Sequence, residues 1–268
     1  MTKAVVLAAG RGTRMQADSP GVRLDEAQRE AAARGLKGLI PFHGQPYLSY
    51  VLSALADAGI GEVILVVRPG ADPIRAHYEA IRTERLRIRF AVQEEPLGTA
   101  HALLMGEEQV GGEPFLLINS DNYYPAPALA AVAALEGSGM AGFRREVLST
   151  RGNIPPERVA AYALVSTDAD GFIEEIVEKP DAADIARLEG HAWISMTCWR
   201  FEQTIFAAAR AVGRSRRGEY ELPDAVAGLV RSGERFRVVP VEEGVLDLSS
   251  RADVPSVAER LAGIEVRL

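Results

Sequence analysis

The stretch AVVLAAGRGTRM at residues 4–15 joins a short apolar run to a glycine-rich loop, and it decides how the fold is interpreted. A short apolar run that stops at a glycine turn is typical of a buried strand. The loop behind such a strand either binds a phosphate through its backbone amides or merely turns the chain. Its own residues and the segments that follow have to distinguish these two roles.

Two well-known glycine fingerprints do not match this loop. A P-loop requires GxxxxGK followed by Ser or Thr, and the loop lacks that pattern. A dinucleotide-binding GxGxxG loop fits Gly10 and Gly12 but finds Met15 at the third position, where close helix packing needs glycine. What remains is a tight turn with Arg11 and Arg14, whose guanidinium groups can fork onto phosphate oxygens. The loop alone leaves phosphate binding and a structural turn both open.

Strand-like and helix-like segments alternate along the first half of the chain. The predicted strands are residues 3–8, 62–67, 86–92, 114–118, 160–166, 172–177, 192–199 and 235–241. The predicted helices are residues 24–34, 46–58, 72–81, 99–109, 127–135, 201–212, 222–231 and 254–261. In the second half strand also follows strand. The predicted fold class is therefore α/β, a Rossmann-like doubly wound, mostly parallel mixed sheet, in a single domain over residues 1–268.

A helical insert at residues 16–36 separates the glycine loop from Lys37. Its predicted helix carries Asp25 and Glu26 in the first turn and Arg34 in the last, and Gly35 is placed to end it. The insert is compatible with a lid over a site and with a solvated surface excursion, and the sequence leaves both open.

Composition and charge exclude several classes of protein. With 268 residues, 47% of them hydrophobic, the chain can bury the core of a soluble globular protein. A net charge of −7 argues against general nucleic-acid or membrane-surface binding, which needs a dominant positive field. Cys198 is the only cysteine, which excludes an intrachain disulfide, and no apolar run approaches the roughly 20 residues that span a bilayer. We expect a cytoplasmic protein without nucleic-acid or membrane partners.

A candidate metal ligand follows a predicted strand in FLLINSDNYYP, residues 115–125. Asp121 stands just after the apolar run, at the carboxyl end where open α/β sheets bind ligands. A carboxylate exposed to nucleotide phosphates at that point would suit Mg²⁺, which prefers oxygen ligands. Asp121 and Asn122 are also typical of a turn, so the segment alone leaves both interpretations open.

A candidate base-binding segment is QEEPLGTAHAL, residues 93–103. The amide of Gln93 offers a donor and an acceptor, which suits the edge of uracil or thymine. Gly98 and Thr99 then open a helix, whose free amides favour anions or polar base atoms. Thr99 is equally typical of an ordinary helix cap.

Six segments in order resemble the sugar-1-phosphate nucleotidyltransferases, or NDP-sugar pyrophosphorylases, over nearly the whole chain. They are LAAGRGTRM (7–15), Lys37 with GLIPFHGQPYLSYVLSAL (38–55), QEEPLGTAHAL (93–103), INSDN (118–122), IVEKP (176–180) and VLDLSSRADV (245–254). The chain has only three lysines, and two of them, Lys37 and Lys179, fall on lysine positions of the family pattern. The resemblance implies the nucleotidyltransferase, GT-A-like fold, with a nucleotide-binding half at 1–125 and a sugar-phosphate-binding half at 126–268.

The resemblance also implies a role for each matching residue. It makes Arg14, Lys37 and Asp121 catalytic, and it assigns Mg²⁺ to Asp121 and Asp247. It assigns the sugar phosphate to Glu178, Lys179 and Ser195. The implied nucleotide-binding residues are Leu7, Ala8, Ala9, Gly10, Arg11, Gly12, Thr13, Gln93, Gly98 and Thr99.

The implied reaction is Mg²⁺-dependent transfer of a nucleotidyl group from UTP or dTTP to a sugar 1-phosphate, which yields an NDP-sugar and pyrophosphate. Because the sugar phosphate already carries a nucleophilic oxygen, the protein has to supply placement and charge neutralisation rather than a base. The family further implies that copies of the chain associate. Three alternatives stay open: a cytidylyltransferase acting on phosphocholine or another alcohol phosphate, a catalytically silent nucleotide-binding subunit, and a dinucleotide-dependent oxidoreductase.

Three departures from the family pattern bear mainly on the identity of the sugar. Leu36 precedes Lys37, after the long insert, where the family usually has proline and a shorter spacer. Ser120 replaces a glycine before the first metal aspartate. Ser195 and Thr197 stand where the family often has Asn and Gly near the sugar.

Overall fold

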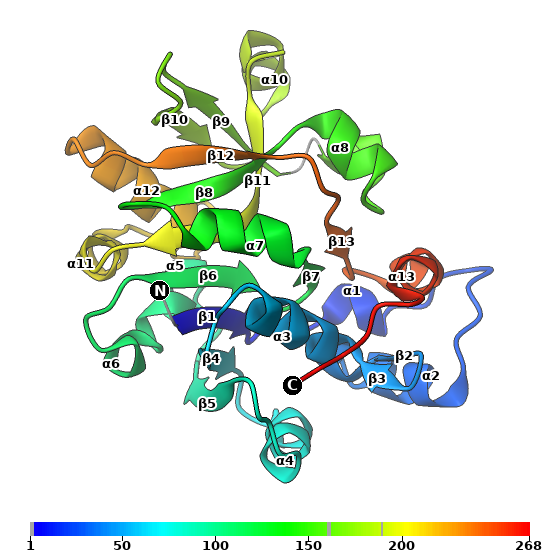
Figure 1. The fold of residues 1–268 in the computed structure, drawn as a ribbon. Helices are drawn as coiled ribbons and strands as arrows, with labels where there is room; N and C mark the ends of the chain where they lie inside the picture. The colour runs from blue at the N-terminus through cyan, green and yellow to red at the C-terminus, as the bar shows by residue number, and fades with distance from the viewer. Residues whose placement is uncertain (1–2, 160–161, 189) are drawn as a thin grey trace.

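A single mixed sheet with helices on both faces organises the chain (Figure 1). The computed structural model describes residues 3–159, 162–188 and 190–268. The main sheet has nine strands, and its longest path runs β10-β9-β11-β6-β1-β4-β5. No helix among these residues is long and apolar enough to cross a membrane.

The first half of the chain forms the parallel part of the sheet. Its strands are β1 (Lys3–Ala8), β4 (Glu62–Val67), β5 (Arg87–Val92) and β6 (Phe115–Asn119), and each neighbouring pair is parallel. Side chains alternate between the two faces along each strand, and nearly all of them are buried in β1 and β4. This explains why these strands are continuous apolar runs in the sequence.

Two helical layers cover the sheet. One face carries α3 (Tyr47–Asp57), α7 (Ala126–Ala133) and α13 (Val254–Leu261). The other carries α5 (Thr99–Leu104), α11 (Thr204–Ala211) and α12 (Leu222–Arg231). The predicted α/β doubly wound class is therefore confirmed.

The second half extends the sheet through antiparallel pairs. Strand β11 (Trp193–Phe201) runs antiparallel to β6 and also pairs with β8 (Gly139–Phe143) and β9 (Ala163–Thr167). Strand β10 (Ile173–Val177) pairs antiparallel with β9, and β12 (Arg237–Val241) pairs parallel with β8. One sheet thus runs through both halves.

Short elements complete the described chain. The helices among them are α1 (Thr13–Gln16), α2 (Glu26–Ala33), η1 (Lys37–Leu39), α4 (Asp72–Ala80), α6 (Glu107–Val110), α8 (Arg145–Thr150), α9 (Pro156–Val159), α10 (Ala182–Leu188) and η2 (Arg251–Asp253). The strands are β2 (Pro41–Phe42), β3 (Gln45–Pro46), β7 (Asn122–Tyr123) and β13 (Leu246–Asp247).

Strand β8 was not predicted, because its sequence GMAGF lacks the side-chain pattern of a strand. Both glycines are needed because neighbouring atoms leave no room for a side chain. A Cβ on Gly139 would lie 2.4 Å from the carbonyl oxygen of Arg237, and a Cβ on Gly142 would lie 2.4 Å from Val238 Cγ1. The strand is thus formed by its pairing with β11 and β12 rather than by local preference.

Two predicted elements differ in extent. The helix predicted at 99–109 is two helices, α5 and α6, because the chain turns at Gly106 where it packs on Val5 and Ile64 of the sheet. In the strand predicted at 160–166, residues 160 and 161 lie outside the described residues, and β9 begins at Ala163.

Candidate active site

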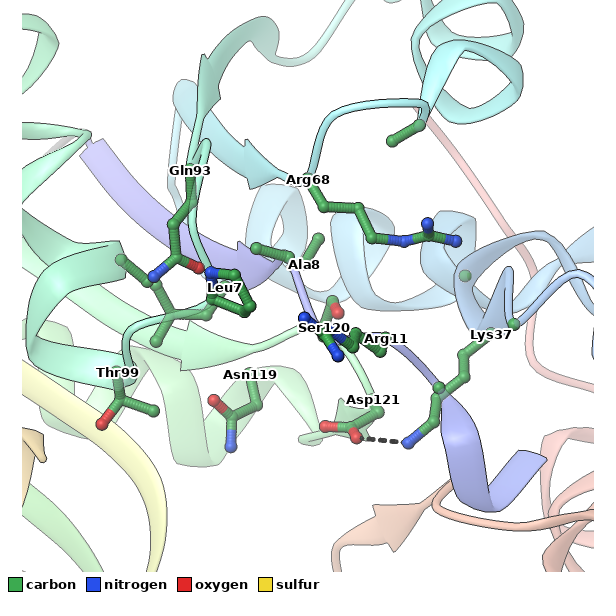
Figure 2. Close-up of a pocket in the computed structure, with 18 of the residues that line it drawn as sticks. Leu7, Ala8, Arg11, Lys37, Arg68, Gln93, Thr99, Asn119, Ser120 and Asp121 are labelled. Carbon is green, nitrogen blue, oxygen red and sulfur yellow. Dashed lines mark hydrogen bonds and ion pairs between the residues drawn. The ribbon is translucent and has the colours of Figure 1, made fainter. Parts of the chain in front are cut away.

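A cavity of about 680 Å³ opens where β1, β4, β5 and β6 end (Figure 2). This carboxyl edge is where open α/β sheets bind ligands. Every residue predicted to bind the nucleotide or to be catalytic lines it: Leu7, Ala8, Ala9, Gly10, Arg11, Gly12, Thr13, Arg14, Lys37, Gln93, Gly98, Thr99 and Asp121. The fold therefore brings together, in one cavity, residues that are up to 114 positions apart in sequence (121 − 7 = 114).

The glycine loop is held by the end of the insert. Gly12 has a φ of 65°, and a Cβ there would lie 2.6 Å from the carbonyl oxygen of Gly35. A Cβ on Gly35, whose φ is 67°, would lie 2.5 Å from the carbonyl oxygen of Arg11. Met15, at the third fingerprint position, is fully buried and anchors α1 in the core. The loop is thus a fixed turn built on glycine-to-glycine backbone contact.

The arginines of the loop are exposed at the mouth of the cavity. Among the described residues, neither Arg11 nor Arg14 has a carboxylate within ion-pair distance. Their guanidinium donors are therefore available to an anion in the cavity.

Lys37 and Asp121 form an ion pair on the cavity wall. Lys37 begins η1, and its Nζ lies 3.0 Å from Asp121 Oδ2. The two side chains are 16% and 27% exposed, so both groups still face the cavity. A cation and a carboxylate at one point can neutralise a phosphate and hold a divalent cation against it.

Buried Tyr47 holds the backbone beside Asp121. The Tyr47 hydroxyl is within donating distance of two carbonyl oxygens, that of Leu246 at 2.8 Å and that of Asp121 at 3.2 Å. The amide of Leu248 donates to the same Asp121 oxygen at 2.9 Å. Burial and the nearby carboxylates raise the pKa of Tyr47 well above its ordinary value, so it stays a donor. These bonds join the end of β6 to β13.

Asp247 lies behind this wall and outside the cavity lining. It is 3% exposed, and its Oδ2 pairs with the guanidinium of Arg158. Its Oδ1 accepts from Asn122 at 3.0 Å and from Ser249 at 3.1 Å. Burial and Asp121 raise the pKa of Asp247 to about 6, against the opposing effect of Arg158. The carboxylate is near Asp121 but is already fully hydrogen-bonded.

Gln93 lines the cavity at the end of β5, and its side-chain amide nitrogen is hydrogen-bonded to other residues of the protein. The NH₂ donates to the carbonyl oxygen of Gly98 at 3.0 Å and lies 3.1 Å from His101 Nδ1. Because the Gly98 oxygen can only accept, it fixes which way the amide points. The amide oxygen of Gln93 is then the group left for a base, as an acceptor only.

The turn at Gly98 is fixed by the segment around Tyr220. Gly98 has a φ of 110°, and a Cβ there would lie 2.5 Å from the Tyr220 carbonyl oxygen. The hydroxyl of Thr99 accepts from the amide of Leu222 at 2.9 Å, and the N-cap of α5 is Gly98 rather than Thr99. The conformation of the candidate base-binding segment therefore depends on a contact with a residue more than 100 positions away in sequence.

The three residues predicted at the sugar phosphate lie outside the cavity lining. Lys179 Nζ is 4.0 Å from Glu221 Oε1, and Arg217, which does line the cavity, is 3.7 Å from the same oxygen. Burial raises the pKa of Glu178 to about 7, and the carboxylates of Glu221 and Asp224 add to it.

Ser195 is buried in β11, where its hydroxyl accepts from the amide of Thr197 at 3.5 Å. The ladder between β11 and β8 shifts register just beyond it, between Ser195 and Trp199. Ser195 is therefore part of a strand irregularity, and its hydroxyl has a partner within the protein.

Two cationic side chains that line the cavity, those of Arg68 and Arg217, were not among the predicted site residues. Arg68 directly follows β4, at the same sheet edge as the glycine loop, and that position is the signal that could have found it. Arg217 belongs to RSRR at 214–217, where three arginines in four residues are typical of an anion-binding loop.

The insert is tied down at both ends. Its helix, predicted at 24–34, is α2, with a capping box between Asp25 and Gln28. Arg251 donates to the carbonyl oxygens of Met15 and Gln16 at 2.9 and 3.1 Å. At its other end Gly35 and Leu36 line the cavity, so this part of the insert is a wall of the site rather than a remote excursion.

Known proteins match nearly the whole length of the chain. The model of the nucleotidyl transferase family covers residues 29–244. The UTP--glucose-1-phosphate uridylyltransferase AglF of Haloferax volcanii is 30% identical over 264 residues, 97% of this chain and 96% of that protein. The bifunctional protein GlmU of Pelotomaculum thermopropionicum is 29% identical over 96% of this chain, which spans about half of that protein (52%). A crystal structure of UDP-glucose pyrophosphorylase with UDP-glucose has the same fold, with a TM-score of 0.74, 18% identity and 97% of both chains covered.

Proposed function

This chain is an enzyme of the nucleotidyl transferase family, and we propose that it transfers a uridylyl or thymidylyl group from UTP or dTTP to a sugar 1-phosphate. The observation that carries the proposal is the Lys37 and Asp121 pair, which faces two unpaired arginines across one cavity. The products are an NDP-sugar and pyrophosphate. UTP is the first candidate, because the Haloferax relative is named a UTP-dependent uridylyltransferase.

The cavity concentrates positive charge in an acidic protein. Five cationic side chains line it, against the carboxylates of Asp121 and Glu219, while the whole chain has a net charge of −7. The cationic residues are Arg11, Arg14, Lys37, Arg68 and Arg217. Such a site attracts a triphosphate and neutralises charge on it. Lys37 would act at the α-phosphate, where the sugar phosphate oxygen attacks and the bridging oxygen leaves.

A divalent cation such as Mg²⁺ fits Asp121. No group of three or more His, Cys, Asp or Glu among the described residues could hold a metal alone. One carboxylate together with substrate phosphates is a common Mg²⁺ arrangement, and Asp121 faces the cavity as that requires. The ion would supply charge neutralisation at the phosphates. Asp247 could join as a second ligand only by giving up its contact with Arg158.

The sugar phosphate would approach from the second half of the chain. Lys179 and Arg217 converge on Glu221 at the edge of the cavity, and both cations suit a phosphate monoester. Glu178, beside Lys179, would accept sugar hydroxyl groups, as would Ser195 after local rearrangement of β11.

The amide oxygen of Gln93 is an acceptor that suits uracil and thymine, because it can accept the N3–H of either base. Cytosine has no hydrogen at N3 and could meet this oxygen only through its amino group, so the choice between these bases is made by the test below.

The proposal is tested by a matrix of UTP, dTTP and CTP against sugar 1-phosphates and phosphocholine with Mg²⁺, read by pyrophosphate release. We expect turnover with UTP or dTTP and a hexose 1-phosphate. Turnover only with CTP and phosphocholine would establish the cytidylyltransferase instead. Tight nucleotide binding without turnover in any combination would identify a silent nucleotide-binding subunit.

A further inference from the structure

Arg68 reaches into the cavity from the end of β4, on the side away from the base-binding segment. Because Val67 pairs with Ala8, Arg68 stands beside the first residue of the glycine loop. Figure 2 shows its side chain extended away from Gln93 and toward the side of the cavity where Lys37 lies. The guanidinium is therefore placed to meet the phosphates rather than the base.

The guanidinium of Arg68 keeps most of its donors free. Its Nη2 donates to the carbonyl oxygen of Arg34, the C-cap of α2, at 3.2 Å. In the part of the chain that the structure describes, no carboxylate lies within ion-pair distance of Arg68. A guanidinium has five N–H donors, so one bond to a carbonyl leaves a fork that fits phosphate oxygens.

The bond to Arg34 connects Arg68 to the end of the insert. Gly35 follows directly and packs against the backbone of Arg11 and Gly12, so the insert, the glycine loop and Arg68 share one wall. The insert thus fixes the direction of the Arg68 side chain relative to the loop arginines.

We propose that Arg68, oriented by the end of the insert, binds the β- and γ-phosphates of the nucleoside triphosphate, the part that leaves as pyrophosphate. This inference rests on the proposed function. Lys37 and Asp121 occupy the wall near the α-phosphate, and the loop supplies Arg11 next to it. Arg68 then adds a cation farther along the triphosphate, where negative charge grows as the bond between the α-phosphorus and the bridging oxygen breaks.

The test compares binding of the nucleoside triphosphate with that of the monophosphate. Calorimetry measures the Kd of UTP and UMP, or of dTTP and dTMP if that is the substrate, for wild type, Arg68→Gln and Arg68→Lys. We expect Arg68→Gln to weaken triphosphate binding about 10- to 100-fold, the loss of one charge-assisted fork, and to change monophosphate binding less than about twofold. Arg68→Lys should restore part of the loss. Arg82→Gln, an exposed arginine outside the cavity, is the matched control.

The outcomes separate this inference from the proposed function. If Arg68 only caps α2, the Tm falls and the ratio of triphosphate to monophosphate affinity stays as in wild type, which overturns the inference. The inference is also overturned if Arg68→Gln weakens binding of the monophosphate as much as it weakens binding of the triphosphate. If wild type binds no nucleoside triphosphate, the proposed function fails first. Wild-type turnover with an unchanged affinity ratio in Arg68→Gln would refute only the role of Arg68.

Discussion

The two halves of the molecule use their charged site residues differently. In the first half, Arg11, Arg14 and Lys37 face one cavity, and among the described residues Asp121, which faces it too, is the only carboxylate within ion-pair distance of them. In the second half, Asp247 is bound to Arg158 and Lys179 lies by Glu221. The charged residues of the first half are therefore open to the cavity, whereas those of the second half are held by partners within the protein.

The largest expected effect comes from the pair that faces the cavity. Lys37→Ala and Asp121→Asn should each lower kcat by about 10²–10³-fold or more, because each removes charge stabilisation at the α-phosphate. Steady-state pyrophosphate release measures this. Lys3→Ala is the matched control, since Lys3 pairs with Glu113 away from the cavity and should leave kcat unchanged. A near-normal rate in either site variant would contradict its assignment.

Removing Arg158 should lower the stability of the protein, because this residue pairs with carboxylates that are buried in the second half of the chain. Arg158→Gln leaves the buried carboxylates of Asp247 and Asp253 without their cation, which should lower the free energy of unfolding by about 3–5 kcal/mol. Urea unfolding without metal measures it. A second variant that adds Asp247→Asn should recover part of the loss.

Arg187→Gln provides the control for that loss. Arg187 pairs with the well-exposed Glu175, and a pair of this kind is worth about 0–1 kcal/mol. Equal losses in the two arginine variants would mean that Asp247 is not held by Arg158 in solution.

Gly35 tests whether the insert supports the glycine loop. Gly35→Ala should weaken triphosphate binding, because its Cβ would meet the carbonyl oxygen of Arg11 in the glycine loop. It should also lower the free energy of unfolding by more than the roughly 1 kcal/mol that a positive φ alone costs an alanine. Gly21→Ala is matched, since Gly21 has a φ of 80° and open space around it. If the two variants bind nucleotide and unfold alike, the insert does not hold the loop.

A pH dependence of stability is also expected from Glu178. Its pKa is about 7 in the folded protein against an ordinary 4.5, so the folded state binds the proton more tightly. The stabilisation is complete below about pH 4.5 and is lost as the pH rises through about 7. Glu178→Gln should flatten this part of the profile of unfolding free energy against pH. The exposed Glu174→Gln should not, and an unchanged slope in Glu178→Gln would refute the shifted pKa.

The agreement between prediction and structure is greatest where local signals are strong. Strands β1 and β4 and helices α12 and α13 begin and end at the predicted residues, because their apolar periodicity already reflects burial. Strand β8 was not predicted, because its two glycines contribute no side-chain pattern and are required by tertiary neighbours such as Arg237 and Val238 of β12.

The sequence by itself determined the doubly wound half and the place of the glycine loop, Gln93 and Asp121, because each of these follows a strand whose carboxyl end must lie at one sheet edge. Lys37 follows the insert instead, and its place at the cavity was predicted from the family resemblance. Only the tertiary structure decided that Asp247 is bound to Arg158, 89 positions away, and that Arg68 is tied to the insert. Such partners depend on how distant segments pack, and no local pattern of residue types encodes that contact.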